Sequence, residues 1–338
     1  MPQYWMITDR TFQNGAPTGD VGKLTYWVSD SASLGQIGNW NPRTSSEFQA
    51  ALVSAADTFP TLVQGDNAQQ KHVCFLIHGY NNGFADAADL YTKVCNQLFA
   101  GPDGLGLCIS LDWPSLGSII GYEPDRDHAR ECANDVADVF DAVNTWLINK
   151  QRQTAKNPDS ACKAKISIIA HSMGNYVTQK ALSAVWKRNN QPLSVSLVNQ
   201  LIMVAADVDN DLFDAKSEDA TDGEAVANLS YRVTSLYSGR DDVLGASAGL
   251  KHFGTRRLGR SGLANRPPIE ADGTKRDNVW DIDCSSFFPS TVTGLSIHGA
   301  YFRTDGTINL MRSILKGIDR GVLDQLGLTA GRVWPPPP

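Results

Sequence analysis

The spacing of apolar and polar residues divides the chain at about residue 72. Before that point, YWMITDR (4–10) and LTYWVSD (24–30) predict two short strands, separated by the turn-rich segment NGAPTGDVG, that pair antiparallel at a sheet edge. SSEFQAALVSAAD (45–57) predicts a helix. Beyond residue 72, apolar runs of strand length alternate with segments of helical periodicity. That alternation is typical of a mostly parallel central sheet covered by helices on both faces.

The later strands and helices can be placed individually from this pattern. Strands are predicted at HVCFLIHGY (72–80), LGLCISLDW (105–113), KISIIAH (165–171), LVNQLIMVAADVD (197–209), SYRVTSLYSGRDD (230–242) and VWDIDCSSF (279–287). Helices are predicted at ADAADLYTKVCNQLFA (85–100), from Asp125 or Asp127 to about Trp146, at GNYVTQKALSAVWK (174–187) and at INLMRSILKGIDRGVLDQL (308–326). No repeat or linker is visible. We therefore expect a single α/β domain over residues 1–338, with its core at about 72–302 and a mobile tail at 331–338.

The bulk composition excludes some classes of protein. Hydrophobic residues make up 42% of the 338 residues and charged residues 20%, which is ordinary for a globular protein with a sizeable core. The net charge of −6 is spread along the chain, so no basic face predicts a nucleic-acid partner. The start MPQYWMITDR has no basic region followed by an apolar one, and no apolar run reaches about 18 residues, so we expect neither a signal peptide nor a membrane span.

Cysteines and acidic residues give no sign of a metal site. The six cysteines are dispersed without a C-x-x-C pair, which favours reduced thiols and a cytoplasmic protein. Asp207, Asp209, Asp211 and Glu218 have the spacing of calcium-loop ligands, but Leu212 stands where that loop needs glycine. We therefore expect no metal and no cofactor. The oligomeric state is not predicted by the sequence.

Ser172, in IIAHSMGNY (169–177), is the main candidate for chemistry. It follows an apolar strand and precedes a helix, with small residues, Ala170 and Gly174, two positions to either side. A serine in such a strained strand-to-helix turn presents its hydroxyl at the carboxyl edge of a parallel sheet. A lone S-x-G could arise by chance, but its place on the third strand of a βαβαβ run favours a nucleophile.

HGYNN (78–82) ends an upstream strand, at the place where an oxyanion donor is expected in such a fold. We expect the backbone N–H of Tyr80 to be one donor and that of Met173, directly after the serine, to be the other. The helix that begins at Met173 or Gly174 points its free N–H groups the same way, which favours a developing negative charge.

A serine hydroxyl needs a base within hydrogen-bond reach, and the base needs a third group to orient it. In an α/β-hydrolase chain order, the acid follows a later strand and the histidine comes near the end. His298, in LSIHGAYF, is the only histidine beyond residue 252 and is the predicted base. SLYSGRDDVL offers Asp241 and Asp242 as the acid. Asp207, which follows the preceding strand, is a third possibility.

The other histidines are predicted in supporting roles. His72 and His128 are expected at the surface. His171 adjoins the serine, but neighbours on a tight turn diverge, so we expect it to support the turn rather than to react. His252 lies in a basic, Gly-rich loop and is expected to anchor that loop.

The substrate pocket is predicted only in outline. Five residues follow the carboxyl end of a strand, where ligand sites gather in α/β proteins: Trp113, Pro114, Ile119, Ile120 and Tyr122. They either line an acyl pocket or cap the core. Because no long apolar insertion precedes Asp241, we expect no large lid. An open cleft would suit a small-molecule ester or a solvent-exposed one.

The motifs AHSMG, HGYNN, DWPSLGSIIGY and HGAYF together resemble a poorly characterised α/β-hydrolase family known mostly as a domain of unknown function. ITDR near the start, W-P-S-x-G followed by Y-x-x-D (Tyr122 to Asp125), and AADVD are similar to further motifs of that family, so the resemblance runs from Tyr4 to about Phe302. It implies an α/β-hydrolase fold and a serine hydrolase, but no substrate. The family pattern S-x-x-D-x-[VA]-L, placed on SGRDDVL, selects Asp241, whereas the broader G-x-x-D habit selects Asp242.

The sequence therefore leads to one hypothesis and its alternatives. The hypothesis is a metal-independent serine hydrolase that cleaves carboxylic esters through an acyl-enzyme, with Ser172, His298 and Asp241 as catalytic residues. One alternative is a lipase or thioesterase that acts on longer acyl substrates. The other is a catalytically inactive hydrolase fold that serves as a binding or scaffold protein, because fold alone does not give activity.

Overall fold

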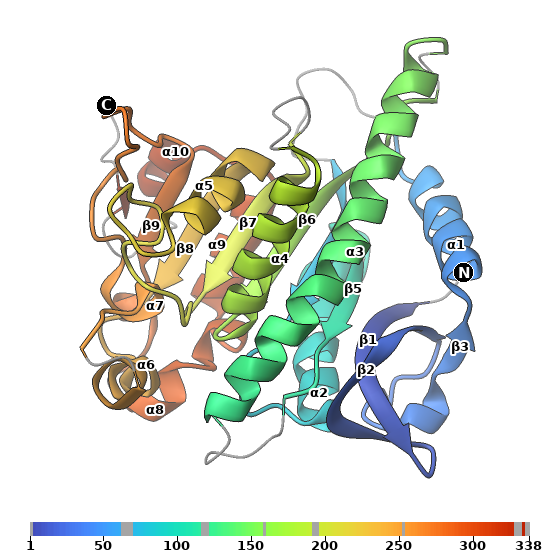
Figure 1. The fold of residues 1–338 in the computed structure, drawn as a ribbon, viewed down its shortest axis with the longest axis horizontal. Helices are drawn as coiled ribbons and strands as arrows, with labels where there is room; N and C mark the ends of the chain where they lie inside the picture. Colours follow the sequence, from blue (N-terminus) through green and yellow to red (C-terminus); the bar gives the residue numbers. More distant parts are fainter. Residues whose placement is uncertain are drawn as a thin grey trace.

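A ten-stranded mixed sheet forms the centre of the computed structural model, which describes residues 3–61, 70–115, 122–157, 160–190, 196–251, 254–327 and 333–334 (Figure 1). The strands follow one another across the sheet in the order β10-β9-β8-β7-β6-β4-β5-β1-β2-β3. Their bounds are β1 Tyr4–Gln13, β2 Ala16–Ser29, β3 Asn41–Arg43, β4 Lys71–Ile77, β5 Gly106–Asp112, β6 Ala164–His171, β7 Val198–Val204, β8 Ser230–Tyr237, β9 Val279–Asp283 and β10 Val333–Trp334.

The strands from β9 to β1 all run parallel to their neighbours, and β2, β3 and β10 pair antiparallel at the two edges. Strands β4, β6 and β7 are apolar along most of their length because helices cover both of their faces. The structure thus confirms the predicted α/β-hydrolase class, with antiparallel strands at the N-terminal edge.

Helices pack on both faces of the sheet, and each face has its own apolar core (Figure 1). One face carries α1 (Ser45–Asp57), α3 (Tyr122–Thr154), α4 (Gly174–Arg188) and α5 (Ala220–Leu229). The other carries α2 (Phe84–Val94), a π-helical turn (Cys95–Phe99), α9 (Asp305–Leu315) and α10 (Arg320–Gln325). The shorter elements are α6 (Asp242–Ala246), α7 (Leu258–Ser261), α8 (Gly294–Ile297), a second π-helical turn (Ser247–Lys251) and 3₁₀ turns at Ile37–Asn39, Ser285–Phe287 and Ala300–Phe302.

The N-terminal hairpin differs from the prediction. Both strands are longer, and only Asn14 and Gly15 form the turn between them. These two residues have φ values of +50° and +77°, as required in the two-residue turns that join twisted antiparallel strands. The segment APTGDVG therefore belongs to β2, because the Asn-Gly pair alone is sufficient to reverse the chain.

The C-terminal region also differs from the prediction. The predicted closing helix is two helices, α9 and α10, because Gly317 between them adopts a φ of +77° that ends the first. Val333–Trp334, in the tail expected to be mobile, pairs antiparallel with β9. Helix α3 begins at Tyr122, earlier than the predicted start at Asp125 or Asp127.

None of the helices in the described residues combines the length and the apolar character needed to cross a membrane. The longest of them, α3, packs against α4 and is amphipathic, with charged residues along its outer face.

Candidate active site

Ser172 lies in the tight turn between the end of β6 and the start of α4. Its φ is +52°, in the left-handed region that non-glycine residues rarely adopt. The backbone around it is held on both sides, because the Ser172 N–H donates to the carbonyl of Val204 at 3.0 Å and the Asp207 N–H donates to the carbonyl of Ser172 at 3.2 Å. The turn therefore has the strained strand-to-helix geometry predicted from the sequence.

The residues that follow the serine explain how this geometry is maintained. A Cβ added to Gly174 would come within 2.4 Å of the His78 carbonyl oxygen, so the start of α4 can approach β4 only with glycine there. The side-chain amide of Asn175 donates to the carbonyls of Ala170 at 3.0 Å and Ser172 at 3.1 Å. In the described part of the chain, the N–H of Met173 donates to no other group, as a helix N-terminus allows.

The loop after β4 passes directly over the serine. A Cβ built on Gly79 would lie 2.6 Å from the Cβ of Ser172, closer than two such atoms can approach. Glycine is thus required at this contact. The next residue, Tyr80, carries one of the two N–H groups predicted to bind an oxyanion, and the short distance at Gly79 brings that part of the loop to the serine.

His298 and Asp241 come together beside this turn. His298 follows α8, and Asp241 precedes α6. The Nδ1 atom of His298 lies 2.8 Å from Oδ2 of Asp241, and the other oxygen, Oδ1, accepts the N–H of Leu244 at 3.1 Å. Asp241 is fully buried. Because a carboxylate only accepts, this contact assigns the proton of a neutral His298 to Nδ1 and leaves Nε2 as a base.

His171 connects the serine turn to His298. Its Nε2 lies 2.9 Å from the His298 carbonyl oxygen, and the two rings are 4.9 Å apart. Burial, followed by the charge that His298 can carry, lowers the pKa of His171 to about 3. His171 is therefore neutral and donates to this carbonyl, which is the supporting position predicted for it.

The described residues contain no hydrogen bond between the Ser172 hydroxyl and the His298 ring. Ser172 immediately follows His171, whose ring centroid lies 4.9 Å from that of His298. Catalytic hydrogen bonds are often long or misaligned without substrate and tighten when it binds.

The two alternative acids have other partners. Asp242 is 61% exposed and pairs with Arg260 at 3.3 Å. Asp207 accepts from Arg257 Nε at 2.8 Å and from the Ser247 hydroxyl at 2.9 Å. Of the three candidates, the structure brings Asp241 to His298.

The predicted pocket residues are only partly described. Trp113 is 2% exposed, and its ring stacks on His78 at a centroid distance of 5.4 Å, so it caps the core and does not line a cleft. Ile119 and the side chain of Tyr122 lie outside the described residues. A cavity of about 850 Å³ lies between α1, α3 and the sheet, but its lining includes none of Ser172, His298 and Asp241.

Two of the histidines predicted at other positions can also be compared with the structure. His72, expected at the surface, is buried in β4 with Nδ1 2.8 Å from the Ser167 hydroxyl, because the strand begins one residue before it. His128 is half-buried on α3 and contacts the carbonyl of Pro114. His252 lies outside the described residues.

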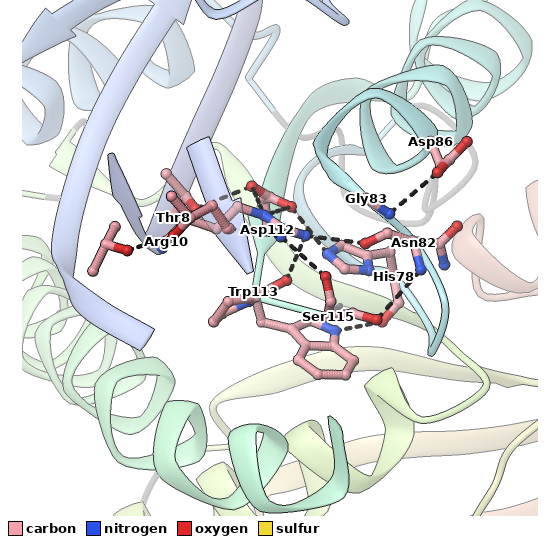
Figure 2. Close-up of polar contacts among 12 residues, drawn as sticks. Thr8, Arg10, His78, Asn82, Gly83, Asp86, Asp112, Trp113 and Ser115 are labelled. Carbon is pink, nitrogen blue, oxygen red and sulfur yellow. Dashed lines mark hydrogen bonds and ion pairs between the residues drawn. The ribbon is translucent and has the colours of Figure 1, made fainter. Parts of the chain in front are cut away.

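A second polar cluster beside the loop after β4 was not predicted. Figure 2 shows Arg10 from β1 reaching Asp112 at the end of β5, which in turn contacts His78. The segments ITDR and DWPS contain Arg10 and Asp112, but from the sequence they were interpreted only as motifs that resemble those of the family. No periodicity or spacing indicated that these residues meet.

Comparisons with known proteins place the chain among α/β hydrolases. A family model for alpha/beta hydrolases of unknown function (DUF900) matches residues 55–288. The uncharacterized protein alr1448 of Nostoc sp. is 24% identical over 147 residues, which span 37% of this chain and 35% of that relative. A Pyrobaculum calidifontis esterase is 9% identical over 73% of this chain and 77% of its own, with a TM-score of 0.34. EstE1, a thermophilic carboxylesterase from a metagenomic library, is 10% identical over 81% of this chain and 97% of its own, with a TM-score of 0.33.

Proposed function

The chain belongs to the alpha/beta hydrolases of the DUF900 family, and from this premise we propose that it is a serine hydrolase that cleaves carboxylic esters. The observation that carries the proposal is the 2.8 Å contact between Asp241 and His298, two residues far apart in the chain, beside a serine at positive φ. A strained serine, a histidine whose Nε2 makes no hydrogen bond to the described residues, and a buried carboxylate are the three groups that acyl transfer through an acyl-enzyme requires.

The proposed reaction begins when Nε2 of His298 takes the proton of the Ser172 hydroxyl as its oxygen attacks the ester carbonyl. Asp241 holds the imidazole in the required tautomer and stabilises the imidazolium that forms. The N–H groups of Tyr80 and Met173 bind the oxyanion of the tetrahedral intermediate, each lowering the barrier by about 3 kcal/mol. His298 then protonates the leaving alcohol. In the second step His298 takes a proton from water as the water oxygen attacks the acyl-enzyme, and it returns the proton to the Ser172 oxygen as the acid leaves.

The proposed substrate is a small-molecule ester or a solvent-exposed one. The sequence contains no long apolar insertion before Asp241 that would form a lid over a long acyl chain. A chain-length series of p-nitrophenyl esters distinguishes this proposal from the alternatives. We expect the highest kcat/KM for short acyl chains; activity confined to long emulsified chains would instead identify a lipase.

The test of the hydrolase itself is covalent labelling. A fluorophosphonate reacts with an activated serine, so we expect a single adduct on the native protein, located at Ser172 by mass spectrometry. Ser172→Ala should carry no adduct while keeping the same melting temperature within a few degrees. A native protein that folds but takes up no label at Ser172 would favour the non-catalytic scaffold.

A further inference from the structure

Arg10 is a buried arginine on β1, and its guanidinium lies against two loops that follow other strands (Figure 2). Its Nε donates to both carboxylate oxygens of Asp112, at 3.1 and 3.0 Å. Asp112 also accepts from the Thr8 hydroxyl at 3.0 Å and faces Nε2 of His78 at 3.1 Å. The side chains of Arg10, Asp112 and His78 are each about 2% exposed. The ion pair is therefore shielded from solvent and from salt.

Three of the four terminal N–H groups of Arg10 bind carbonyls of the same two loops. Nη1 donates to the carbonyl of Ser115 at 3.1 Å, and Nη2 donates to those of Asn82 at 3.1 Å and Trp113 at 2.9 Å. The remaining bond goes to the carbonyl of Thr18 on β2, at 3.1 Å. Since a guanidinium has five N–H groups in a fixed plane, Arg10 fixes the loop after β4 and the loop after β5 relative to each other.

Asp112 is charged at neutral pH. Burial raises the pKa of this carboxyl, but the Arg10 guanidinium and the hydrogen bond from His78 outweigh it and hold the pKa below its ordinary value. The ring of His78 therefore meets a carboxylate at Nε2. At Nδ1 it meets the carbonyl oxygen of Gly79, 2.9 Å away. Because both of these neighbours accept hydrogen bonds, the His78 ring links the Asp112 carboxylate to the Gly79 carbonyl.

The bond from His78 orients one particular peptide. The Gly79 carbonyl oxygen accepts from Nδ1 of His78 at 2.9 Å and from the side-chain amide of Asn82 at 3.0 Å. In a planar trans peptide the N–H points opposite to the C=O, so fixing the Gly79 oxygen also fixes the direction of the Tyr80 N–H. This is the peptide that approaches Ser172, where a Cβ on Gly79 would lie 2.6 Å from the serine Cβ.

We propose that Arg10, Asp112 and His78 are positioning residues that hold the Gly79–Tyr80 peptide in the orientation needed to bind the oxyanion formed at Ser172. The inference rests on the proposed hydrolase function and adds a structural origin for its oxyanion site. It also gives a physical role to ITDR and to DWPS, which the triad leaves unexplained: the first supplies the guanidinium, and the second supplies the carboxylate and two of the carbonyls that the guanidinium binds.

Loss of this positioning should destabilise the transition state and not the bound substrate. The oxyanion exists only after attack, so a misoriented Tyr80 peptide lowers kcat and leaves substrate binding nearly unchanged. Arg10→Ala also leaves a space of the size and charge preference of a guanidinium ion, facing Asp112. Free guanidinium should therefore occupy it and restore part of the rate, which an effect on folding alone would not allow.

The experiment measures p-nitrophenyl acetate hydrolysis by the native protein, Arg10→Ala and Asp112→Asn, with and without guanidinium chloride below its denaturing range. We expect kcat to fall by about 10²-fold in both variants, the usual cost of losing one oxyanion donor, with KM within threefold of the native value. The inhibition constant of an alkyl trifluoromethyl ketone, which forms a tetrahedral adduct, should rise by a similar factor. Guanidinium should raise kcat at least tenfold in Arg10→Ala and not in Asp112→Asn.

Arg266→Ala is the matched control, because Arg266, in the loop preceding β9, pairs at 2.6 Å with the buried Asp281 of β9. It should lose stability without the 10²-fold fall in kcat and without rescue by guanidinium.

Crystal structures of Arg10→Ala and Asp112→Asn give a readout that needs no activity: we expect the Gly79–Tyr80 peptide to be rotated or present in more than one orientation. An unchanged peptide in both variants, or an unchanged kcat, overturns the positioning role. A native protein whose Ser172 takes no fluorophosphonate overturns the hydrolase instead, and the crystal structures still decide whether the cluster orients the peptide.

Discussion

Two polar clusters lie side by side at the carboxyl edge of this sheet, and they are bonded very differently. The first, the Arg10 cluster, consists of Arg10, Asp112 and His78. The side chains of Arg10 and Asp112 are each 2% exposed, and every N–H of the guanidinium has an acceptor. The second, the Ser172 cluster, consists of Ser172, His298 and Asp241. The His298 side chain is 14% exposed, and only one of its ring nitrogens contacts a described side chain, that of Asp241. The serine hydroxyl makes no hydrogen bond to the described residues.

This difference in hydrogen bonding suits the Arg10 cluster to a rigid structural role and the Ser172 cluster to proton transfer. A fully satisfied buried ion pair is costly to disturb and holds the atoms around it in one arrangement. A hydroxyl and an imidazole nitrogen without fixed partners keep their capacity to exchange a proton with a substrate. The first cluster connects strand β1 to the loops after β4 and β5, and the second lies where the loop after β4 approaches Ser172.

The strongest test of this comparison is the acid of the Ser172 cluster. Asp241→Asn should lower kcat about 10⁴-fold, because the amide no longer fixes the imidazole tautomer or stabilises the imidazolium. Steady-state hydrolysis of p-nitrophenyl acetate measures it. The adjacent Asp242→Asn is the control and should stay within threefold of the native kcat, because its side chain is exposed and faces Arg260. The reverse ranking would show that the acid is Asp242.

The contact between the two clusters is tested at Gly79. Gly79→Ala places a Cβ 2.6 Å from that of Ser172, so either the loop or the serine must move. A displacement of about 1 Å at a reacting group costs on the order of 10²-fold in kcat/KM. The control is Gly83→Ala in the same loop, where the nearest atom to an added Cβ is 3.5 Å away. Equal activity in the two variants would show that the loop does not approach the serine in solution.

Asp9 sharpens the comparison because it is the neighbour of Arg10 on β1 but faces the other side of the sheet. Its Oδ2 is buried, with no hydrogen-bond partner in the described part of the chain. Burial is the main cause that raises the pKa of Asp9 from its ordinary value of 3.8 to about 6, and the hydrogen bond with Cys132 opposes it. Among the described residues, no cation forms an ion pair with Asp9, whereas Asp112 is paired with Arg10.

The sign of the pH effect follows from that shift. The folded state binds the Asp9 proton more tightly than the unfolded state, so this contribution to stability is fully present below about pH 4 and is lost as the pH rises through about 6. Asp9→Asn remains neutral and should raise the free energy of unfolding at pH 8 by about 3 kcal/mol. Urea unfolding at pH 4 and pH 8 measures it, with almost no difference expected at pH 4. Destabilisation at pH 8 would contradict the assignment.

The smallest effect is expected at an exposed ion pair. Arg188 on α4 lies 2.5 Å from Asp138 on α3, but the two side chains are 38% and 62% exposed. Arg188→Ala should lower the free energy of unfolding by less than about 1 kcal/mol and leave kcat unchanged. Thermal unfolding and ester hydrolysis on the same sample check both. A loss as large as that in Arg10→Ala would mean that burial is not what distinguishes the Arg10 cluster.

Much of the fold was predictable because its signals are local. Alternation of apolar strands and amphipathic helices indicated the α/β class, and the S-x-G turn indicated where a strained serine lies. The errors also have local causes. The Asn14–Gly15 pair forms a shorter hairpin turn than the full turn-rich segment suggested, and Gly317 divides the closing helix.

Chain order predicted His298 and Asp241 as partners, and tertiary structure was needed to choose between Asp241, Asp242 and Asp207. Adjacent residues such as Asp241 and Asp242 have the same chemistry in a sequence. They differ in the fold because one precedes α6 with its carboxylate buried, while the other points to Arg260 at the surface. The burial of Trp113 likewise depends on the His78 ring from another loop.

By itself, the sequence determined the order of strands and helices, the position of the serine turn and the residue types available for acyl transfer, because these depend on neighbours within a few residues. Only the tertiary structure decided that Arg10 meets Asp112, about a hundred residues away, since that contact depends on β1 pairing with β5. Strand pairing is set by the packing of the whole sheet, and no periodicity within either segment encodes it.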